Sequence, residues 1–178
     1  MPGLDETRPF IPVGIAVLTV SDTRTLADDR SGDTLAARIK EAGHRLVDRA
    51  IVPDDRQAIA SRVKAWTERD DIDVVITTGG TGFTGRDVTP EALEPLFEKR
   101  MDGFGEAFRR LSWEEIGPRA ILSRATAGVV GGLVVYSLPG SPKAVRLGVR
   151  TLIAPTLEHA VDLAQGRTAH AHSRPMRA

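Results

Sequence analysis

The chain has 178 residues, a mass of 19.2 kDa, a hydrophobic content of 41% and a formal net charge of zero at pH 7. This size and composition predict one globular domain with a buried core. The lack of a basic excess argues against nucleic acid as the main partner. The absence of cysteine excludes disulfides, thiolate metal sites and cysteine nucleophiles. With no apolar signal core and no apolar run near the roughly 20 residues of a membrane span, we expect a soluble cytoplasmic protein.

The first third of the chain predicts an irregular arm, then a strand and a helix. Residues 1–12 contain three prolines and several charges, which favour an arm without regular structure. Val13 to Val20 is a continuous apolar run, typical of a strand covered on both faces in a parallel sheet. Ser31 or Asp33 is expected to cap the following helix, and Gly43 is expected to end it.

A second strand and helix precede the centre of the sequence. Arg45 to Val52 is predicted to be a strand, and Pro53-Asp54-Asp55 is expected to interrupt it and cap the next helix. On that helix three apolar side chains fall on one face, namely Ile59, Val63 and Trp66.

The centre of the chain is predicted to be a strand, a glycine loop and a helix. Val74 to Thr77 is a short β-branched run. The loop after it contains Gly79, Gly80, Gly82 and Gly85, which allow a ligand to approach the main chain closely. Thr89 is expected to cap a helix with Pro90 at its first position. This arrangement presents free backbone N–H groups at the sheet edge where anions commonly bind, although it matches neither familiar phosphate-binding loop.

The second half predicts helices around a hairpin. Residues 101–105 read as a glycine-punctuated break before a helix, and residues 112–118 as a loop or short helical turn. Gly131-Gly132 between two apolar runs predicts a two-residue hairpin over residues 127–138. Further helices are expected to start at Ser141-Pro142 and Pro155. The sequence then ends in a polar tail, residues 166–178.

The alternation of strands and helices predicts an α/β fold with helices on both faces of a mostly parallel sheet and one antiparallel hairpin. Residues 13–165 are expected to form its single domain. Loops that follow parallel strands meet at one edge of the sheet and can surround one ligand. We expect the ligand to be contacted by side chains or backbone groups of these loops and by Ser112. The candidate loop residues are Ser21, Asp22, Asp54, Thr78, Gly79, Gly80, Thr81, Gly82, Thr84, Asp87, Pro139, Gly140 and Ser141.

Asp54 and Asp87 are the strongest candidates for catalytic or metal-binding residues. Two carboxylates at a phosphate-binding edge can hold Mg²⁺, which prefers hard oxygen ligands and would neutralise charge during nucleotidyl transfer. The alternative is that Asp54 is a helix cap and that Asp87 is a loop residue paired with Arg86. Ser141 is similarly open between ligand contact and cap. No histidine pair outside the tail has metal-ligand spacing, and no G-x-S-x-G indicates a serine triad.

Several motifs together resemble one family. These are T-V-S-D-T, V-P-D-D, T-T-G-G-T-G-F-T-G-R-D-V-T-P-E-A, G-F-G-E, L-S-R-A-T-A-G and L-P-G-S-P-K-A-V, spread over residues 13–164. They resemble the molybdopterin-binding MoaB/MogA family of molybdenum cofactor biosynthesis, and they are similar to the G domain of gephyrin and to the plant Cnx proteins. The block S-W-E-E-I-G, starting at Ser112, looks closer to MoaB than to MogA.

The resemblance implies a three-layer α/β/α sandwich and adenylyl transfer from ATP to molybdopterin with a divalent metal. It implies that Asp54 and Asp87 are the catalytic aspartates and that Ser112 binds phosphate. The glycine loop and the Pro139-Gly140-Ser141 turn match the pterin-binding segments. It also implies a homotrimer or homohexamer, with other molybdenum cofactor biosynthesis proteins as partners. The rival hypotheses are a non-catalytic molybdopterin carrier and an unrelated nucleotide-binding domain.

Overall fold

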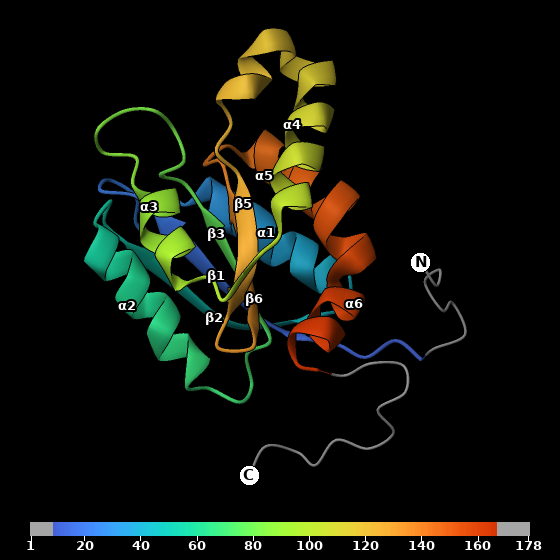
Figure 1. Ribbon diagram of the computed structural model, residues 1–178. Coiled ribbons are helices and arrows are strands. Elements are labelled where there is room, and N and C mark those ends of the chain that lie inside the picture. Colours follow the sequence, from blue (N-terminus) through green and yellow to red (C-terminus); the bar gives the residue numbers. More distant parts are fainter. Residues whose placement is uncertain (1–8, 167–178) are drawn as a thin grey trace.

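The computed structural model describes residues 9–166, which form a six-stranded sheet in the order β2-β1-β3-β6-β5-β4 (Figure 1). β2, β1, β3 and β6 are parallel to one another, whereas β5 pairs antiparallel with β6 and β4. The strands are β1 (Gly14–Val20), β2 (Arg45–Val52), β3 (Val74–Thr78), β4 (Lys99–Arg100), β5 (Thr126–Val130) and β6 (Leu133–Leu138). The predicted mostly parallel sheet with a hairpin is confirmed, and the two-residue β4 extends it beyond the prediction.

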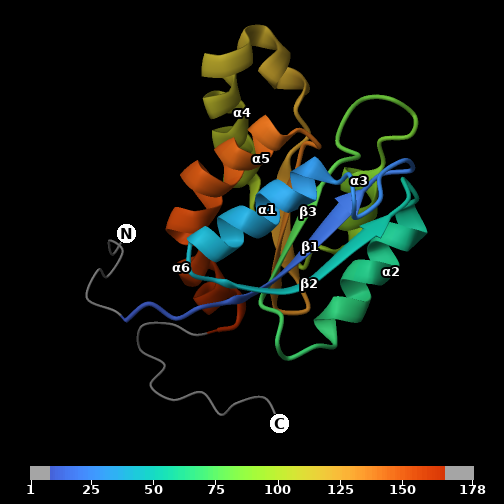
Figure 2. The same cartoon turned by 180° about the vertical axis from the view of Figure 1, so that it is seen from behind.

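Helices cover both faces of the sheet (Figures 1 and 2), so the expected three-layer sandwich is confirmed. One face carries α1 (Arg30–Glu41), α4 (Asp102–Ile116), α5 (Pro142–Gly148) and α6 (Ala154–Ala164), and the other carries α2 (Arg56–Thr67) and α3 (Thr89–Leu93). A π-helical segment, Val149–Ile153, joins α5 to α6, and 3₁₀ segments span Glu94–Leu96 and Gly117–Leu122.

The central strand β1 explains why the sheet is buried on both sides. All seven of its residues are buried. Ile15 and Val17 belong to the apolar cluster beneath α1 and α6, while Ala16 and Leu18 belong to the cluster beneath α2. A strand with both faces covered has no polar face, which is why it reads as a continuous apolar run.

Two predicted helix starts are wrong. The N-cap of α1 is Asp29, whose Oδ1 accepts a hydrogen bond of 2.9 Å from the N–H of Gly32. Ser31 and Asp33 already lie inside the helix. Thr89 is the first residue of α3 rather than its cap, and its hydroxyl donates to the carbonyl of Gly79 at 2.9 Å. The hydroxyl of Ser31 instead donates to the carbonyl of Gly140 at 2.7 Å, so both expected capping hydroxyls bind carbonyls elsewhere in the chain.

The predicted break at residues 101–105 is wrong, because α4 begins at Asp102 and runs unbroken through Gly103 and Gly105 to Ile116. Of residues 112–118, predicted as a loop or short helical turn, residues 112–116 belong to α4 and residues 117–118 begin the 3₁₀ segment Gly117–Leu122. Phe104 and Phe108 are buried against the sheet. Glycine costs about 1 kcal/mol in a helix interior, which the burial of two aromatic side chains exceeds. Ser112 follows on the same face of α4 and is buried.

Other local predictions are confirmed. Gly131 and Gly132 have φ angles of 56° and 82°, as a tight two-residue hairpin between β5 and β6 requires. Gly43 has a φ of 80° just after α1, and Ser141 caps α5 by accepting from the N–H of Ala144 at 3.1 Å. Residues 1–8 and 167–178, most of the predicted arm and tail, lie outside the described residues. Within residues 9–166 no helix combines the length and hydropathy needed to cross a bilayer.

Asp29 anchors the start of α1 through a buried polar network. It is 2% exposed, and its Oδ2 accepts from the hydroxyl of Thr19 at 2.6 Å and from Arg49 at 2.9 Å. Burial raises the pKa of Asp29, but the hydrogen bonds from Thr19, Arg49 and Gly32 outweigh burial, so the pKa lies below its usual value. The ionised form is therefore the one that stabilises the fold.

We predict that Asp29→Ala lowers the free energy of unfolding by about 3 kcal/mol at pH 7, because it removes a cap and leaves Arg49 without its buried partner. Since folding lowers the pKa of Asp29, the charge contribution is present above about pH 4 and is lost as the pH falls through the folded-state value. Urea unfolding measured from pH 3 to pH 7 should show that the difference in the free energy of unfolding between the variant and wild type becomes smaller in acid.

Asp33→Asn is the matched control, because Asp33 also binds Arg49, at 2.7 Å, but its side chain is 58% exposed. An exposed pair contributes less than about 1 kcal/mol. An equal decrease in the free energy of unfolding in Asp29→Ala and Asp33→Asn would contradict the role given to Asp29.

Candidate functional site

The sheet has a topological switch point between β1 and β3, because the chain leaves β1 for β2 on one side and returns as β3 on the other. Ligands of open α/β sheets bind in the crevice at the carboxyl ends of such strands. The loops that follow β2, β1, β3 and β6 lie side by side at this edge (Figure 2). Asp22 accepts from the N–H of Asp54 at 2.9 Å, and the hydroxyl of Thr78 donates to the carbonyl of Pro139 at 3.1 Å.

A cavity of about 280 Å³ opens at the switch point. It is bordered by the ends of β1 and β3, the turn after β6 and the starts of α1 and α5. Four predicted site residues line it: Ser21, Thr78, Gly79 and Gly140. Seven further residues line it that we did not predict as ligand contacts: Thr19, Val20, Arg24, Asp29, Arg30, Ser31 and Pro142.

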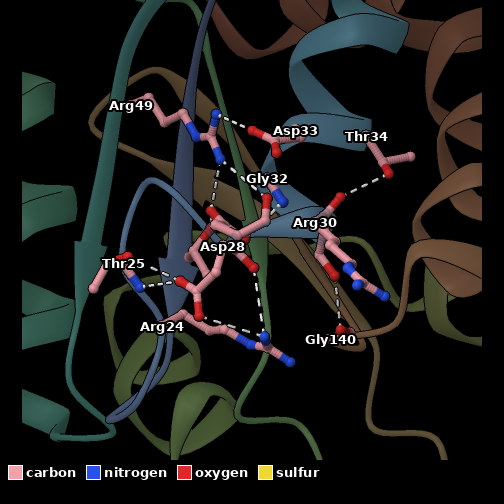
Figure 3. A network of polar contacts seen from close by, with 12 residues as sticks. Arg24, Thr25, Asp28, Arg30, Gly32, Asp33, Thr34, Arg49 and Gly140 are labelled. Atoms are coloured by element: carbon pink, nitrogen blue, oxygen red, sulfur yellow. Dashed lines mark hydrogen bonds and ion pairs between the residues drawn. The ribbon is translucent and has the colours of Figure 1, made fainter.

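The cavity carries positive charge from the start of α1. Arg24 lines the cavity and is held by Asp28, at 3.6 Å in an exposed ion pair (Figure 3). Arg30, the first residue of α1, also lines the cavity and forms no ion pair with any other residue in the range 9–166, whereas the Asp29 carboxylate in the lining is paired with Arg49. The helix N-terminus adds a partial positive charge. The cavity therefore suits an anionic group.

The network around Asp29 fixes this wall of the cavity. Figure 3 shows Arg49 of β2 reaching toward Asp33 and the start of α1. Beside it, the hydroxyl of Ser31 donates to the carbonyl of Gly140 at 2.7 Å, which joins α1 to the turn after β6. The residues before α1 were predicted only as a charged loop, and the long-range contacts that give this loop its structure have no local sequence signal.

The glycine loop, residues 79–88, begins against β1. Gly79 has a φ of 100°, and a Cβ there would lie 2.4 Å from the carbonyl oxygen of Val20, so no larger residue fits. Thr89 closes the base of the loop, because its N–H donates to the carbonyl of Gly80 at 2.9 Å and its hydroxyl to that of Gly79. Thr81 is buried, whereas the loop is exposed from Gly82 to Arg86.

Asp87 folds back onto the glycine loop. Its Oδ2 accepts from the N–H of Thr84 at 2.9 Å and from the Thr84 hydroxyl at 2.6 Å. A Cβ on Gly82 would lie 2.7 Å from the same oxygen, which shows how closely the carboxylate packs there. The Thr84 hydroxyl contributes most to lowering the pKa of Asp87 below its usual value. The proposed pairing with Arg86 is wrong, because Arg86 binds Asp22 at 2.7 Å.

Asp54 occupies a different electrostatic environment. It is half-buried, and its carboxylate lies close enough to the backbone N–H of Asp22 for that group to act toward lowering its pKa. Burial, then the charge of Asp22 and more weakly that of Asp87, raises the pKa of Asp54 above its usual value. The capping alternative is wrong for Asp54, because Asp55 is the cap of α2 and accepts from the N–H of Ala58 at 2.7 Å.

The two carboxylates face the same loop, since a Cβ on Gly80 would lie 3.0 Å from Oδ1 of Asp54. No group of three or more Asp, Glu, His or Cys side chains in the described part of the chain is arranged to hold a metal. A cation at this loop could be held by at most the two carboxylates of Asp54 and Asp87, which both lie against it. This fits Mg²⁺, which commonly binds one or two carboxylates and completes its shell with water and substrate phosphate.

Two predicted serines lie beside the site rather than in the cavity lining. Ser112 is buried on α4, whose last turns are held beside the start of α5 by an ion pair of 3.2 Å between Glu115 and Lys143. Ser141 acts as the cap of α5. The cap does not prevent its hydroxyl from donating to a ligand, because the hydroxyl accepts the N–H of Ala144.

Arg124 contacts the glycine loop, and our sequence prediction missed it. Its Nη2 donates to the carbonyl of Asp87 at 2.9 Å across 37 positions of sequence, and Nε donates to that of Thr81 at 3.3 Å. It also forms an ion pair with Glu91. The residue lies just before β5 in the motif L-S-R-A-T-A-G, to which we gave no role from the sequence, and only the folded chain reveals the contact.

The comparisons with known proteins agree with this geometry. Residues 16–159 match the family described as "Probable molybdopterin binding domain". The chain is 51% identical over 149 residues to "Molybdenum cofactor biosynthesis protein B" of Escherichia coli, covering 84% of this chain and 88% of that protein. It is 50% identical over 144 residues to the protein of the same name from Bacillus cereus, covering 80% of this chain and 85% of the relative.

Solved structures are similar over nearly their whole length. A crystal structure of molybdenum cofactor biosynthesis protein B has a TM-score of 0.87 and 46% identity, covering 89% of this chain and 99% of that one. A tungsten cofactor synthesizing protein MoaB from Pyrococcus furiosus has a TM-score of 0.74 and 38% identity, with coverages of 86% and 98%. From its sequence and its fold, the chain belongs to the probable molybdopterin binding domain family.

Proposed function

We propose that this protein acts in molybdenum cofactor biosynthesis, where it binds molybdopterin and adenylates it with ATP and Mg²⁺. The names of its relatives support the pathway. The observation that carries the reaction is the pair of acidic residues at the switch point, Asp54 and Asp87, whose pKa values are shifted in opposite directions. Opposed shifts in neighbouring carboxyl groups are typical of functional sites.

The site offers separate places for the two anionic substrates. The glycine loop, with the hydroxyls of Thr81 and Thr84, is proposed to receive the terminal phosphate of molybdopterin. The adjoining cavity, with Arg24 and Arg30 at its wall, would receive ATP phosphates. Both groups then meet at the end of β3, where Asp54, which follows β2, and Asp87 of the glycine loop both lie against that loop.

In the proposed reaction, a phosphate oxygen of molybdopterin attacks the α-phosphorus of ATP. A P–O bond forms to the α-phosphorus while its bond to the bridging oxygen breaks, and pyrophosphate leaves. Bound Mg²⁺ would neutralise charge on the phosphates during this transfer. Asp87 stays ionised through its hydrogen bonds to Thr84. Asp54 and Asp87 would hold the cation, and the chain otherwise positions the two phosphates in line.

The alternative function is that of a carrier, which binds molybdopterin but does not catalyse adenylyl transfer. Incubation of the protein with ATP, Mg²⁺ and molybdopterin separates the two, because only the enzyme releases pyrophosphate and forms adenylyl-molybdopterin. Binding of molybdopterin without pyrophosphate release would favour the carrier. Tight ATP binding with no response to molybdopterin would favour an unrelated nucleotide-binding domain.

The family resemblance also leads us to propose a homotrimer or homohexamer. Apolar side chains gather in an exposed position on α4 and the following 3₁₀ segment, where Ile121 is 67% and Trp113 is 49% exposed. Both residues line a second cavity of about 420 Å³. Exposed apolar clusters of this kind commonly mark protein interfaces. Sedimentation equilibrium tests the proposal, and a monomer at all concentrations would contradict it.

We predict that Asp87→Asn lowers the turnover of adenylyl transfer by about 10²-fold or more, because it removes a charge that acts mainly in the transition state. The binding of molybdopterin, measured by fluorescence titration, should change little, since the amide can still accept from Thr84. Asp55→Asn is the control, because the Asp55 carboxylate is engaged as the cap of α2 and an asparagine can cap in its place. Wild-type turnover in Asp87→Asn would refute the assignment.

A separate prediction concerns the cavity wall. Arg30→Gln should raise the KM for ATP about tenfold and leave kcat nearly unchanged, because a charged hydrogen bond to phosphate would be lost equally from the ground state and the transition state. Arg38→Gln, on the same helix but paired with Glu41 at 2.8 Å, is expected to behave like wild type. An unchanged KM in steady-state kinetics would remove Arg30 from the site.

A further inference from the structure

The side chain of Arg124, which precedes β5, contacts both ends of the exposed part of the glycine loop. Its Nε donates to the carbonyl of Thr81 at 3.3 Å and its Nη2 to the carbonyl of Asp87 at 2.9 Å. The first carbonyl lies just before the exposed part of the loop and the second just after it. One side chain therefore restrains both points at which this part of the loop begins and ends.

The same guanidinium is itself held in place. Its Nη1 forms an ion pair with Glu91 in the first turn of α3, and its Cζ lies 5.5 Å from the ring centroid of Phe83 in the loop. The Arg124 side chain is 24% exposed. The second oxygen of Glu91 is buried and has no hydrogen-bond partner within residues 9–166. The Glu91 side chain is 34% exposed, so the ion pair is partly solvated and adds little stability of its own.

The remaining contacts leave the exposed part of the loop weakly restrained. Thr89 holds only Gly79 and Gly80 at the base. Asp87 and Thr84 bind each other within the loop, which fixes their relative position and not their position on the sheet. Arg86 reaches Asp22, but this ion pair is between side chains that are 68% and 38% exposed. Exposed pairs contribute little.

From these contacts we propose that Arg124 is a positioning residue, which sets the glycine loop so that the Asp87 carboxylate lies where adenylyl transfer needs it. This inference rests on the proposed function. The carbonyl carbon of Asp87 is bonded directly to the Cα that carries the carboxylate side chain, so a shift at this carbonyl moves the carboxylate. Arginine suits the role because its planar fork presents donors in several fixed directions at once, which lysine does not.

The experiment compares Arg124→Lys with Glu91→Gln and Arg119→Lys. Arg124→Lys keeps the charge that faces Glu91 but loses the paired carbonyl contacts. Glu91→Gln removes the charge pair and leaves Arg124 free to keep those contacts. Arg119, exposed in the 3₁₀ segment Gly117–Leu122, is the matched arginine control.

For Arg124→Lys we expect kcat to fall about 10²-fold, the loss that a small misplacement of a reacting group produces, while the KM values for ATP and molybdopterin change less than about threefold. For Glu91→Gln the expected loss in kcat is below about tenfold. Arg119→Lys should match wild type. An Arg124→Lys enzyme with wild-type kcat, or equal losses in Arg124→Lys and Glu91→Gln, would overturn the proposal.

Hydrogen exchange provides a readout that does not depend on activity. In Arg124→Lys, amides of residues 82–88 should exchange about tenfold faster, whereas those of β1 and α1 should not change. Unchanged exchange in the loop would overturn the positioning role even in an active enzyme. If the wild-type protein transfers no adenylyl group, the proposed function fails, and loop exchange alone then decides whether Arg124 sets the loop.

Discussion

The parallel pairing of β1 with β2 on one side and with β3 on the other is the constraint on which the site depends. Because β1 is buried along its whole length, its register with both neighbours is fixed by packing on two faces. That register places Val20, Val52 and Thr78 at one edge of the sheet. The loops that follow these strands all start at this edge, so residues far apart in sequence lie close together there.

Charge divides this edge into two parts. Arg24 and Arg30 face the cavity beside α1, while Asp54 and Asp87 lie against the glycine loop. A phosphate chain that spans the two parts would contact cationic groups at one end and share a cation with the carboxylates at the other. Burial raises the pKa of Asp54, whereas local hydrogen bonds lower that of Asp87, so the two acids are not equivalent.

Much of the fold could be predicted from the sequence, because its signals are local. The apolar run of β1, the Gly131-Gly132 turn and the Ser141-Pro142 helix start each follow from the chemistry of a few neighbouring residues. The errors occurred where tertiary contacts prevail. The hydroxyl of Thr89 donates a hydrogen bond to the carbonyl of Gly79 instead of capping α3. The burial of Phe104 and Phe108 stabilises α4 as a continuous helix despite the glycines in its first turn.

The candidate site shows the same division. Glycine density and polar strand ends indicated the loop and the aspartates, and the family resemblance added their proposed roles. Arg30 and Arg124 were not assigned a role in this way: Arg30 lies in a charged loop and helix start, and Arg124 lies in the motif L-S-R-A-T-A-G, whose letters do not show which group it contacts. The structure also decides between the two readings of Asp54, since Asp55 and not Asp54 caps the first turn of α2.

The central claim is that Asp54 and Asp87 act together on one cation and one reacting phosphate. A double-mutant cycle tests it most directly, with the rate of adenylyl transfer measured for Asp54→Asn, Asp87→Asn and the double variant. If the residues act as a unit, the double variant should be no slower than the slower single variant. Losses that multiply in the double variant would show that the two carboxylates work independently, and would contradict the account.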